Sequence, residues 1–233
     1  MSDVCPHGVC DGTGFVIDEA TNTATDCRCR PLRISRAKAR RLEARLPQRY
    51  RDVAFDRFPV TEIDPSVVSQ VRRFTRDVDT SLDEGRGIWF FGDVGTGKTT
   101  LAMLVSKAAL AAGRTCAIYS LPRLLNVLRD AIGNDESTLE LLDRLNSVDL
   151  LHLDDVGAEN SSDWVLEQLY SIINTRYEDQ RSLVITTNLQ PDELSEQIGE
   201  RTVSRIIEIC GDPLPLFGND QRREYRAAPS PSS

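Results

Sequence analysis

A glycine-rich segment that follows a short apolar run constrains this chain more than any other feature. Residues 92–99 read Gly-Asp-Val-Gly-Thr-Gly-Lys-Thr, which fits the pattern G-x-x-x-x-G-K-[ST]. The apolar residues 88–91 precede it, and the Ala- and Leu-rich residues 98–112 follow it. These flanks predict a strand, a tight loop and a helix, and in that context successive N–H groups and the helix N-terminus face an anion. The segment therefore predicts a phosphate-binding loop rather than a chance glycine-rich turn.

The residue types in this loop suit a nucleotide with its magnesium ion. The three glycines let the backbone wrap closely around phosphate oxygens. Lys98 is expected to reach the β- and γ-phosphates, and Thr99 to ligate Mg²⁺. The full set of expected nucleotide-binding residues is Gly92, Asp93, Val94, Gly95, Thr96, Gly97, Lys98, Thr99 and Thr100.

A second apolar strand runs into two acidic residues. Residues 148–153 lead to Asp154 and Asp155, and Asp154 lies 56 residues after the lysine of the phosphate loop. Asp154 is expected to hold the magnesium ion together with Thr99 and water, and Asp155 to orient or deprotonate a water molecule. His152 lies on the opposite side of the strand from its neighbours, and we expect it to be structural rather than catalytic.

A third strand ends in a polar residue that can complete such a site. Residues 182–187 are followed by Asn188. In a parallel sheet the carboxyl ends of the strands lie on the nucleotide side. Asn188 is therefore expected to position the attacking water. The alternative, an ordinary turn asparagine, is less favoured beside the other two elements.

Strand and helix patterns alternate along most of the chain. This alternation predicts an α/β fold with a mainly parallel sheet covered by helices on both faces. Strands are expected over residues 88–91, 115–120, 148–153, 182–187 and 207–210. Helices are expected over residues 65–81, 98–112, 121–131, 138–146, 163–177, 191–198 and 201–206.

Composition limits the remaining possibilities. With 233 residues, of which 40% are hydrophobic and 27% charged, the chain has room for one α/β domain and a small appendage. It has no apolar run near the roughly 18 residues of a membrane span, and no secretory signal pattern at its N-terminus. We therefore expect a cytoplasmic protein with no membrane contact. The Pro- and Ser-rich residues 227–233 are expected to form a disordered tail.

The net charge of −8 hides a basic segment. Residues 28–57 carry eleven Lys or Arg and three acids, a net charge of about +8, and the rest of the chain is about −16. Within this segment, residues 31–46 contain good helix formers and end before a proline, so they predict a basic helical linker. Concentrated positive charge keeps nucleic acid open as a partner. A solvated charged helix is the alternative.

Four of the six cysteines lie within the first 29 residues. Residues 1–30 contain too little apolar surface to fold unaided, and two pairs of soft ligands separated by a turn-rich hairpin suit tetrahedral zinc. His7 replaces Cys5 in an alternative ligand set, because His7 and Cys10 have the more usual two-residue gap. Unliganded reduced thiols are a further alternative. The expected zinc ligands are Cys5, Cys10, Cys27 and Cys29.

Together these elements resemble the AAA+ ATPases. The closer likeness is to bacterial and phage replicative helicase loaders of the DnaC/DnaI kind and to their transposition-helper relatives of the IstB kind. The resemblance covers about residues 47–210. It is carried by residues 47–50 with Phe55, 87–102 (GIWFFGDVGTGKTTLA), 150–157 (LLHLDDVG), 184–189 (VITTNL) and 199–205 (GERTVSR).

The resemblance implies roles for individual residues. Asp154 corresponds to the metal-binding acid of the Walker B strand, Asp155 to its catalytic acid and Asn188 to the sensor-1 residue. Arg205 resembles the arginine finger, and Arg201 is the other candidate. Few residues follow position 210, which implies a core without a C-terminal helical lid and without a clear sensor-2 arginine. The catalytic residues implied are Lys98, Asp154, Asp155, Asn188 and Arg205.

The same resemblance implies an ATPase that serves as a helicase loader in DNA replication. A head over residues 1–30, similar to the zinc knuckles of some loaders, and the linker over 31–46 would grip a DnaB-type replicative helicase. A P-loop AAA+ core over 47–226 would bind ATP, single-stranded DNA and further copies of the chain. Three alternatives remain: an IstB-like transposition helper, whose relatives usually lack a Cys-rich head, a P-loop small-molecule kinase, and a nucleotide-locked scaffold without turnover.

Overall fold

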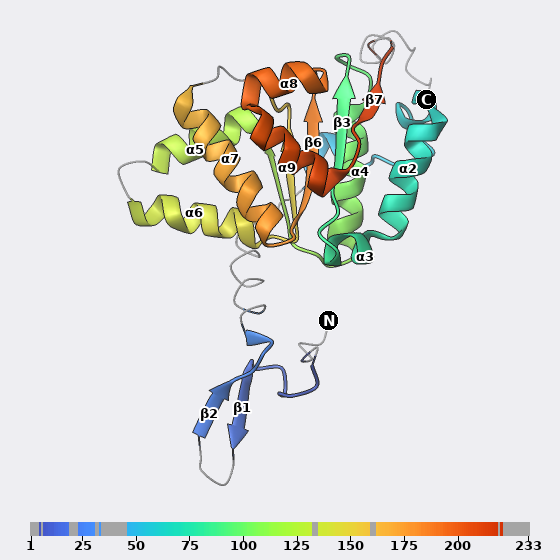
Figure 1. Ribbon diagram of the computed structural model, residues 1–233. Coiled ribbons are helices and arrows are strands. Elements are labelled where there is room, and N and C mark those ends of the chain that lie inside the picture. The colour runs from blue at the N-terminus through green and yellow to red at the C-terminus, as the bar shows by residue number, and fades with distance from the viewer. Residues whose placement is uncertain are drawn as a thin grey trace.

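The structure is a computed structural model (Figure 1), and it describes residues 5, 7–18, 23–30, 33, 46–131, 135–158, 162–218 and 220. Most of the linker expected over 31–46 and all of the tail expected over 227–233 lie outside these residues. The described chain forms a small N-terminal head and an α/β core.

The core is built on a five-stranded parallel sheet. Its spatial order is β4-β5-β6-β3-β7, and each neighbouring pair is parallel. The predicted α/β class and parallel sheet are therefore confirmed, and the three strands expected to carry the site are neighbours. The strands are β3 (Ile88–Gly92), β4 (Cys116–Ser120), β5 (Leu150–Asp154), β6 (Ser182–Thr187) and β7 (Leu214–Leu216).

Helices cover both faces of this sheet (Figure 1). Two short 3-10 turns, η1 (Gln48–Tyr50) and η2 (Val60–Glu62), precede them. One face packs against α2 (Pro65–Arg76), α3 (Val78–Asp83) and α4 (Lys98–Ala111). The other packs against α5 (Leu121–Ala131), α6 (Asp135–Ser147), α7 (Asp163–Glu178), α8 (Pro191–Ile198) and α9 (Glu200–Cys210).

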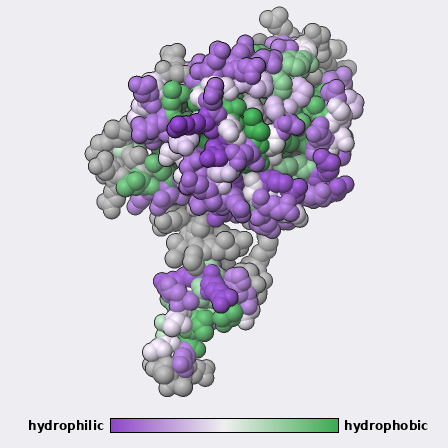
Figure 2. Space-filling view, in the orientation of Figure 1, coloured by the Kyte–Doolittle hydropathy of each residue, from purple (hydrophilic) through white to green (hydrophobic). Residues whose placement is uncertain are grey.

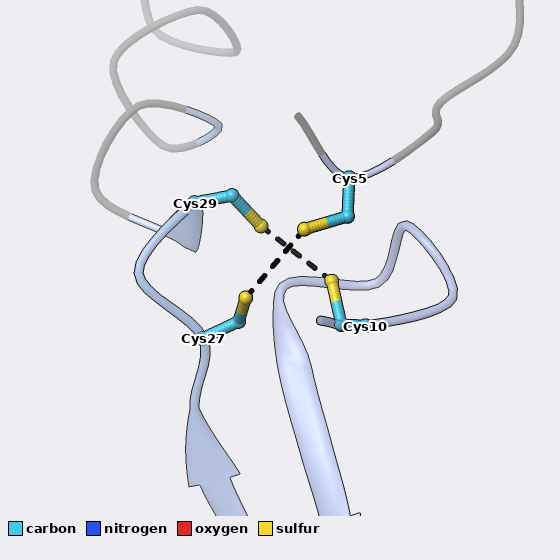
Figure 3. Close-up of side chains that lie close together, drawn as sticks. All are labelled: Cys5, Cys10, Cys27 and Cys29. Atoms are coloured by element: carbon cyan, nitrogen blue, oxygen red, sulfur yellow. Dashed lines mark hydrogen bonds between the residues drawn. The ribbon is translucent and has the colours of Figure 1, made fainter. Parts of the chain in front are cut away.

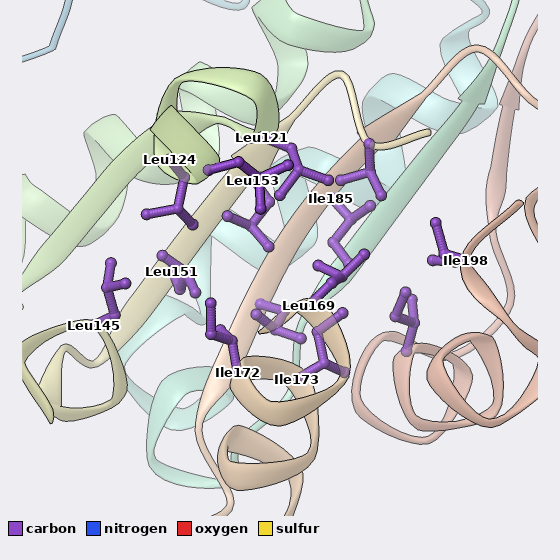
Figure 4. Packing of buried hydrophobic residues seen from close by; sticks show 14 of the residues in the cluster. Leu121, Leu124, Leu145, Leu151, Leu153, Leu169, Ile172, Ile173, Ile185 and Ile198 are labelled. Carbon is purple, nitrogen blue, oxygen red and sulfur yellow. The ribbon is translucent and has the colours of Figure 1, made fainter. Parts of the chain in front are cut away.

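A hydrophobic cluster on each face holds these layers together, and Figure 4 shows the one beneath α5–α9. Successive side chains of a strand point to opposite faces. In β5, Leu150 therefore packs with α2–α4, whereas Leu151 and Leu153 pack with α5–α9. All three are fully buried. Burial on both faces explains why the strands are nearly continuous apolar runs, and it makes the sheet a rigid support for the loops at its edge.

Two local predictions were wrong. Residues 65–81 form two helices rather than one, because Asp77 departs from helical geometry at φ −100° and ψ 28° and separates α2 from α3. Residues 207–210 continue α9 instead of forming a strand. The buried residues of α9 recur at helical spacing and pack on the sheet, which outweighs the strand preference of the isoleucines. They are Thr202, Val203, Ile206 and Ile209.

The head is a hairpin joined to a cluster of cysteines. Strand β1 (Phe15–Asp18) pairs antiparallel with β2 (Thr23–Asp26). The Arg30 guanidinium lies over the Phe15 ring, 4.1 Å from its centroid. Among the described head residues, the buried core consists of cysteines alone. An isolated two-stranded hairpin is marginally stable at best, so the head needs a source of stability other than apolar burial.

The described surface of the α/β core domain is mostly polar. In the view of Figure 2, hydrophilic residues cover most of the core, and hydrophobic residues are exposed on the head. On the head, Val9 and Ile17 are 53% and 62% exposed. No helix in the described part of the chain is long and apolar enough to cross a membrane.

Candidate functional site

The predicted phosphate loop, acidic pair and asparagine meet at one edge of the sheet. The loop follows β3, Asp154 ends β5 with Asp155 directly after it, and Asn188 follows β6. Since these strands are parallel neighbours, their carboxyl ends share that edge. A cavity of about 1100 Å³ lies there, and Lys98, Thr99, Asp155 and Asn188 are among its lining residues.

The phosphate loop has the backbone that its glycines predict. Gly92, Gly95 and Gly97 have φ angles of +127°, +84° and +100°, which side-chain-bearing residues rarely adopt. Gly97 precedes the first turn of α4, whose N–H groups lack partners within the helix and can bind an anion. Lys98 Nζ donates to the carbonyl oxygens of Gly92 and Asp93 at 2.7 and 2.5 Å. The loop therefore holds its positive charge in place.

Asp154 is hydrogen-bonded to Thr99, the other residue expected to hold magnesium. Thr99 Oγ1 donates to Asp154 Oδ1 at 3.0 Å, and Thr186 Oγ1 donates to the same oxygen at 2.6 Å. Burial disfavours the charged carboxylate, but His152, Thr186 and Thr99 outweigh burial, so the pKa of Asp154 lies below its usual value. Asp154 is thus ionised at neutral pH, and carboxylate is the form that binds Mg²⁺.

His152 lies behind Asp154 rather than in the cavity. Its ring is fully buried, with Nδ1 2.9 Å from Ser106 Oγ and Nε2 3.9 Å from Asp154 Oδ1. It is not among the residues that line the cavity. Because Ser106 belongs to α4, the His152 side chain packs from β5 against that helix, a position compatible with the structural role expected for it.

Asp155 has a backbone conformation that is uncommon outside glycine. Its φ is +57°, and its N–H donates to Thr186 Oγ1 at 2.9 Å. A hydrogen bond from the turn after β5 to Thr186 of β6 therefore fixes this turn. Asp155 and Asn188 line the same cavity from these two adjacent strands.

The sequence analysis missed one wall of the cavity. Lys107 of α4 fixes the segment that forms this wall by donating to the carbonyl oxygens of Arg51 and Val53, at 2.9 and 2.8 Å. Aromatic rings beside guanidinium groups suit contact with a nucleotide base. The one sequence signal was the run over 47–50, to which we gave no role in the site. The wall consists of Arg49, Tyr50, Asp52, Val53, Arg57, Phe58 and Pro59.

Asp220 was also missed, and it lies against the phosphate loop. It lines the cavity, and a Cβ added at Gly95 would collide with its carboxylate. The chain before it is held by Gly218, whose N–H donates to Asp93 Oδ2 at 3.2 Å. A carboxylate therefore occupies part of the loop that is expected to bind phosphate.

Asp220→Asn is expected to tighten ATP binding about fivefold or more, because a carboxylate some 4 Å from a phosphate repels it by about 1 kcal/mol even at the dielectric constant of water. Calorimetric titration with ATP measures the change. Asp212→Asn is the matched control, since Asp212 is exposed and does not line the cavity. Unchanged or weaker binding by the Asp220 variant would contradict the prediction.

Arg205 lies outside the nucleotide cavity of its own chain. Its guanidinium donates to Glu208 Oε1 at 2.8 Å and lies over the Tyr177 ring, 4.1 Å from its centroid. Arg201, the other arginine considered, does not line the cavity either. An arginine that acts on a neighbouring chain's nucleotide must lie outside its own cavity, so the position of Arg205 is compatible with that role.

The four cysteines of the head point toward one another (Figure 3). The Cys5 and Cys27 sulfurs are 3.7 Å apart, those of Cys10 and Cys29 are 3.5 Å apart, and all four lie within 4.8 Å of one another. None of them forms a disulfide. Tetrahedral zinc, with Zn–S bonds of about 2.3 Å, separates its sulfurs by about 3.8 Å. The cluster is therefore compatible with one structural zinc ion.

The surroundings of the cluster favour the four-cysteine set. Backbone N–H groups of Cys10 and Val9 lower the pKa of the Cys5 thiol to about 5, whereas burial raises the pKa of the Cys29 thiol to about 12. Thiolate is the form that binds metal, so the bound ion would deprotonate Cys29. Cys5 is only 3% exposed. His7 is exposed and, within the part of the chain that the structure describes, does not belong to the metal-binding group.

The purified protein is expected to contain about one zinc ion per chain. A Cys27→Ser, Cys29→Ser double variant should lose that zinc together with the ordered head, because metal binding supplies the folding free energy that the hairpin lacks. Elemental analysis and NMR of the head give the two readouts, and Cys210→Ser, which lies outside the cluster, should retain the metal. A zinc-free protein with an ordered head would contradict this account.

This fold and this loop define a P-loop nucleotide-binding protein with an AAA+ type of core. The sequence profile of the family described as IstB-like ATP binding protein matches residues 30–208, which is most of the chain. The chain belongs to that family.

Two relatives that are named replicative helicase loaders are similar to part of the chain. It is 26% identical to the replicative helicase loader DnaC of Escherichia coli K12 over 142 residues, which are 60% of this chain and 57% of that protein. It is 26% identical to the replicative helicase loader DnaI of Bacillus subtilis 168 over 175 residues, 68% of this chain and 55% of that protein. The chain thus spans a little over half the length of these relatives. A crystal structure of the DnaC helicase loader superposes with a TM-score of 0.65 and 27% identity, and covers 74% of this chain and 100% of that one.

Proposed function

We propose that this protein is an ATP-hydrolysing loader that delivers a replicative DNA helicase to single-stranded DNA. The observation that carries the proposal is the similarity of the chain to two proteins that are named replicative helicase loaders. The phosphate loop, Asp155 and Asn188 line one cavity, and Asp154 is hydrogen-bonded to Thr99 beside it. This arrangement supports a site that turns ATP over. The function would be exercised in the cytoplasm.

Each residue of the site has a proposed role in transfer of the γ-phosphoryl group to water. Lys98 binds the β- and γ-phosphates, and Thr99 and Asp154 hold Mg²⁺, which when bound neutralises phosphate charge. Asp155 accepts a proton from the attacking water, and Asn188 orients that water. Arg205 of a neighbouring copy stabilises the charge that develops on the γ-phosphate, so the chains self-associate through their ATP sites.

We further propose that the zinc-stabilised head contacts the helicase. Val9 and Ile17 are apolar and more than half exposed on a domain that has little core of its own. Exposed apolar side chains of this kind are typical of a protein-binding surface.

The proposal is tested by co-purification of the tagged full-length chain with the replicative helicase of the same host. The wild-type chain is expected to retain the helicase. A Val9→Asp, Ile17→Asp variant should lose it while still binding ATP, and Leu139→Asp, at a 65% exposed apolar position of the core, is the matched control. Failure of the wild-type chain to retain the helicase would contradict the proposed function. Retention by the head variant would contradict the role of the head alone.

Single-stranded DNA is expected to bind weakly and to lose affinity steeply as salt rises. Each phosphate contact releases counterions, so log K should fall by about 0.7 per contact for each tenfold rise in salt. Fluorescence anisotropy across a salt series measures the slope. Binding that does not depend on salt would contradict the prediction.

A transposition helper of the IstB kind is the second candidate, because the family profile that matches the chain carries the IstB name. Such a protein would assemble on duplex DNA. The cysteine-rich head favours the loader, and a strong preference for duplex over single-stranded DNA would favour the helper.

A further inference from the structure

One buried threonine contacts three consecutive residues at the end of the acidic strand. Thr186 lies on β6, which pairs with both β5 and β3, and it is fully buried. Its hydroxyl donates to Asp154 Oδ1 at 2.6 Å and accepts the N–H of Asp155 at 2.9 Å. Its carbonyl oxygen accepts the N–H of Val156 at 2.9 Å. The threonine therefore connects the metal-binding acid, the catalytic acid and the turn that follows them.

These contacts fix Asp154 and Asp155, the two residues whose positions matter most for the proposed reaction. The Thr186 hydroxyl donates its one proton to Asp154 and accepts a hydrogen bond from the Asp155 N–H. Its hydrogen-bonding capacity is therefore met by these two residues. Asp155 has a φ of +57°, a conformation that persists only where neighbouring structure holds it. Removal of the hydroxyl would leave the Asp155 N–H without this acceptor and Asp154 with one hydroxyl donor fewer.

We infer that Thr186 is a positioning residue for ATP hydrolysis. Its hydroxyl orients the Asp154 carboxylate toward Mg²⁺, and it holds the Asp155 backbone so that the Asp155 carboxylate faces the attacking water. The inference rests on the roles proposed above for Asp154 and Asp155. Thr186 does not line the cavity, so it acts through these two residues and not on the nucleotide.

The test compares Thr186→Val, which keeps the shape of the side chain without its hydroxyl, with Thr186→Ser, which keeps the hydroxyl. The valine variant is expected to lower kcat about 10- to 100-fold, as for loss of a hydrogen bond to a charged group. Its KM for ATP should change by less than about threefold, because no contact with the nucleotide is lost. The Mg²⁺ concentration for half-maximal binding of a non-hydrolysable ATP analogue should rise about tenfold, as for other groups that orient a metal ligand. The serine variant should restore all three values.

The matched control is Ser182→Ala on the same strand. The Ser182 side chain is also fully buried, and its hydroxyl has no hydrogen-bond partner in the described part of the chain. Rates are divided by the concentration of sites that bind a non-hydrolysable ATP analogue, so loss of folded protein does not count as loss of turnover. The control should have wild-type kcat and Mg²⁺ dependence.

Two results would overturn the inference: a valine variant with wild-type kcat and Mg²⁺ dependence, or a serine variant as impaired as the valine variant. Asp155→Asn is measured in parallel. If that variant keeps wild-type hydrolysis, the proposed catalytic site is wrong. If it loses hydrolysis while Thr186→Val does not, only the role of Thr186 fails.

Discussion

Arg205→Ala is expected to leave ATP binding intact and to lower ATP hydrolysis on the order of 10³- to 10⁵-fold in the assembled protein, the range known for an arginine finger. Arg205 lies on α9, outside the nucleotide cavity of its own chain. On that helix its guanidinium donates to the Glu208 carboxylate. That pair is partly exposed, and such pairs contribute less than about 1 kcal/mol, so it is no obstacle to a contact with a neighbouring chain.

A mixing experiment separates action between chains from a local structural effect. Lys98→Ala chains are expected to lose ATP binding but keep Arg205, whereas Arg205→Ala chains are expected to bind ATP but lack the proposed finger. Mixtures of the two should recover part of the hydrolysis that each lacks alone. No recovery at any ratio, with both variants folded and able to assemble, would show that Arg205 does not act on a neighbouring site.

Two further variants serve as controls for Arg205. Glu208→Gln removes the negative charge that pairs with Arg205 in its own chain. This variant should hydrolyse ATP at close to the wild-type rate if the local ion pair is unimportant. Arg201→Ala should do the same if Arg205 is the finger. A large loss in the Arg201 variant and none in the Arg205 variant would assign the role to Arg201.

Asp155→Asn is expected to bind ATP with wild-type affinity and to lose turnover about 10²- to 10⁴-fold, the usual contribution of a positioned general base. The proposed metal ligand Asp154 remains, and the amide keeps the shape of the side chain while it loses the ability to accept a proton. Phosphate release and analogue binding give the two readouts. Lys98→Ala, in contrast to Asp155→Asn, should lose ATP binding, because the positive charge that contacts the phosphates is removed. Wild-type hydrolysis by either variant would contradict the assignment of the site.

Much of this site could be predicted from the sequence because its parts are local. The phosphate loop and the acidic pair are each a short run of residues, and each run directly follows an apolar strand. Once β3, β5 and β6 are recognised as parallel strands, their carboxyl ends must share an edge. The sequence did not predict the order of the strands in the sheet. The structure shows that β5, β6 and β3 are direct neighbours.

The parts that escaped prediction depend on contacts between distant residues. β7 is only three residues long and contains a proline, so it has no recognisable strand pattern, yet it pairs with β3 and leads Asp220 to the phosphate loop. Thr186 reads as an ordinary strand residue until the register places it beside the acidic pair. Arg176 reads as a surface arginine of α7, but it is fully buried and donates to the carbonyl oxygens of Leu145, Val148 and Ser182.

The central claim, that the chain loads a helicase, is tested most directly by transfer of the host's replicative helicase to circular single-stranded DNA, which offers no free end for threading. Gel filtration of the circle measures the bound helicase. With the wild-type chain and ATP, more helicase should elute with the circle than without the chain, and Lys98→Ala should lose this effect. An equal amount of helicase on the circle with and without the chain would contradict the account.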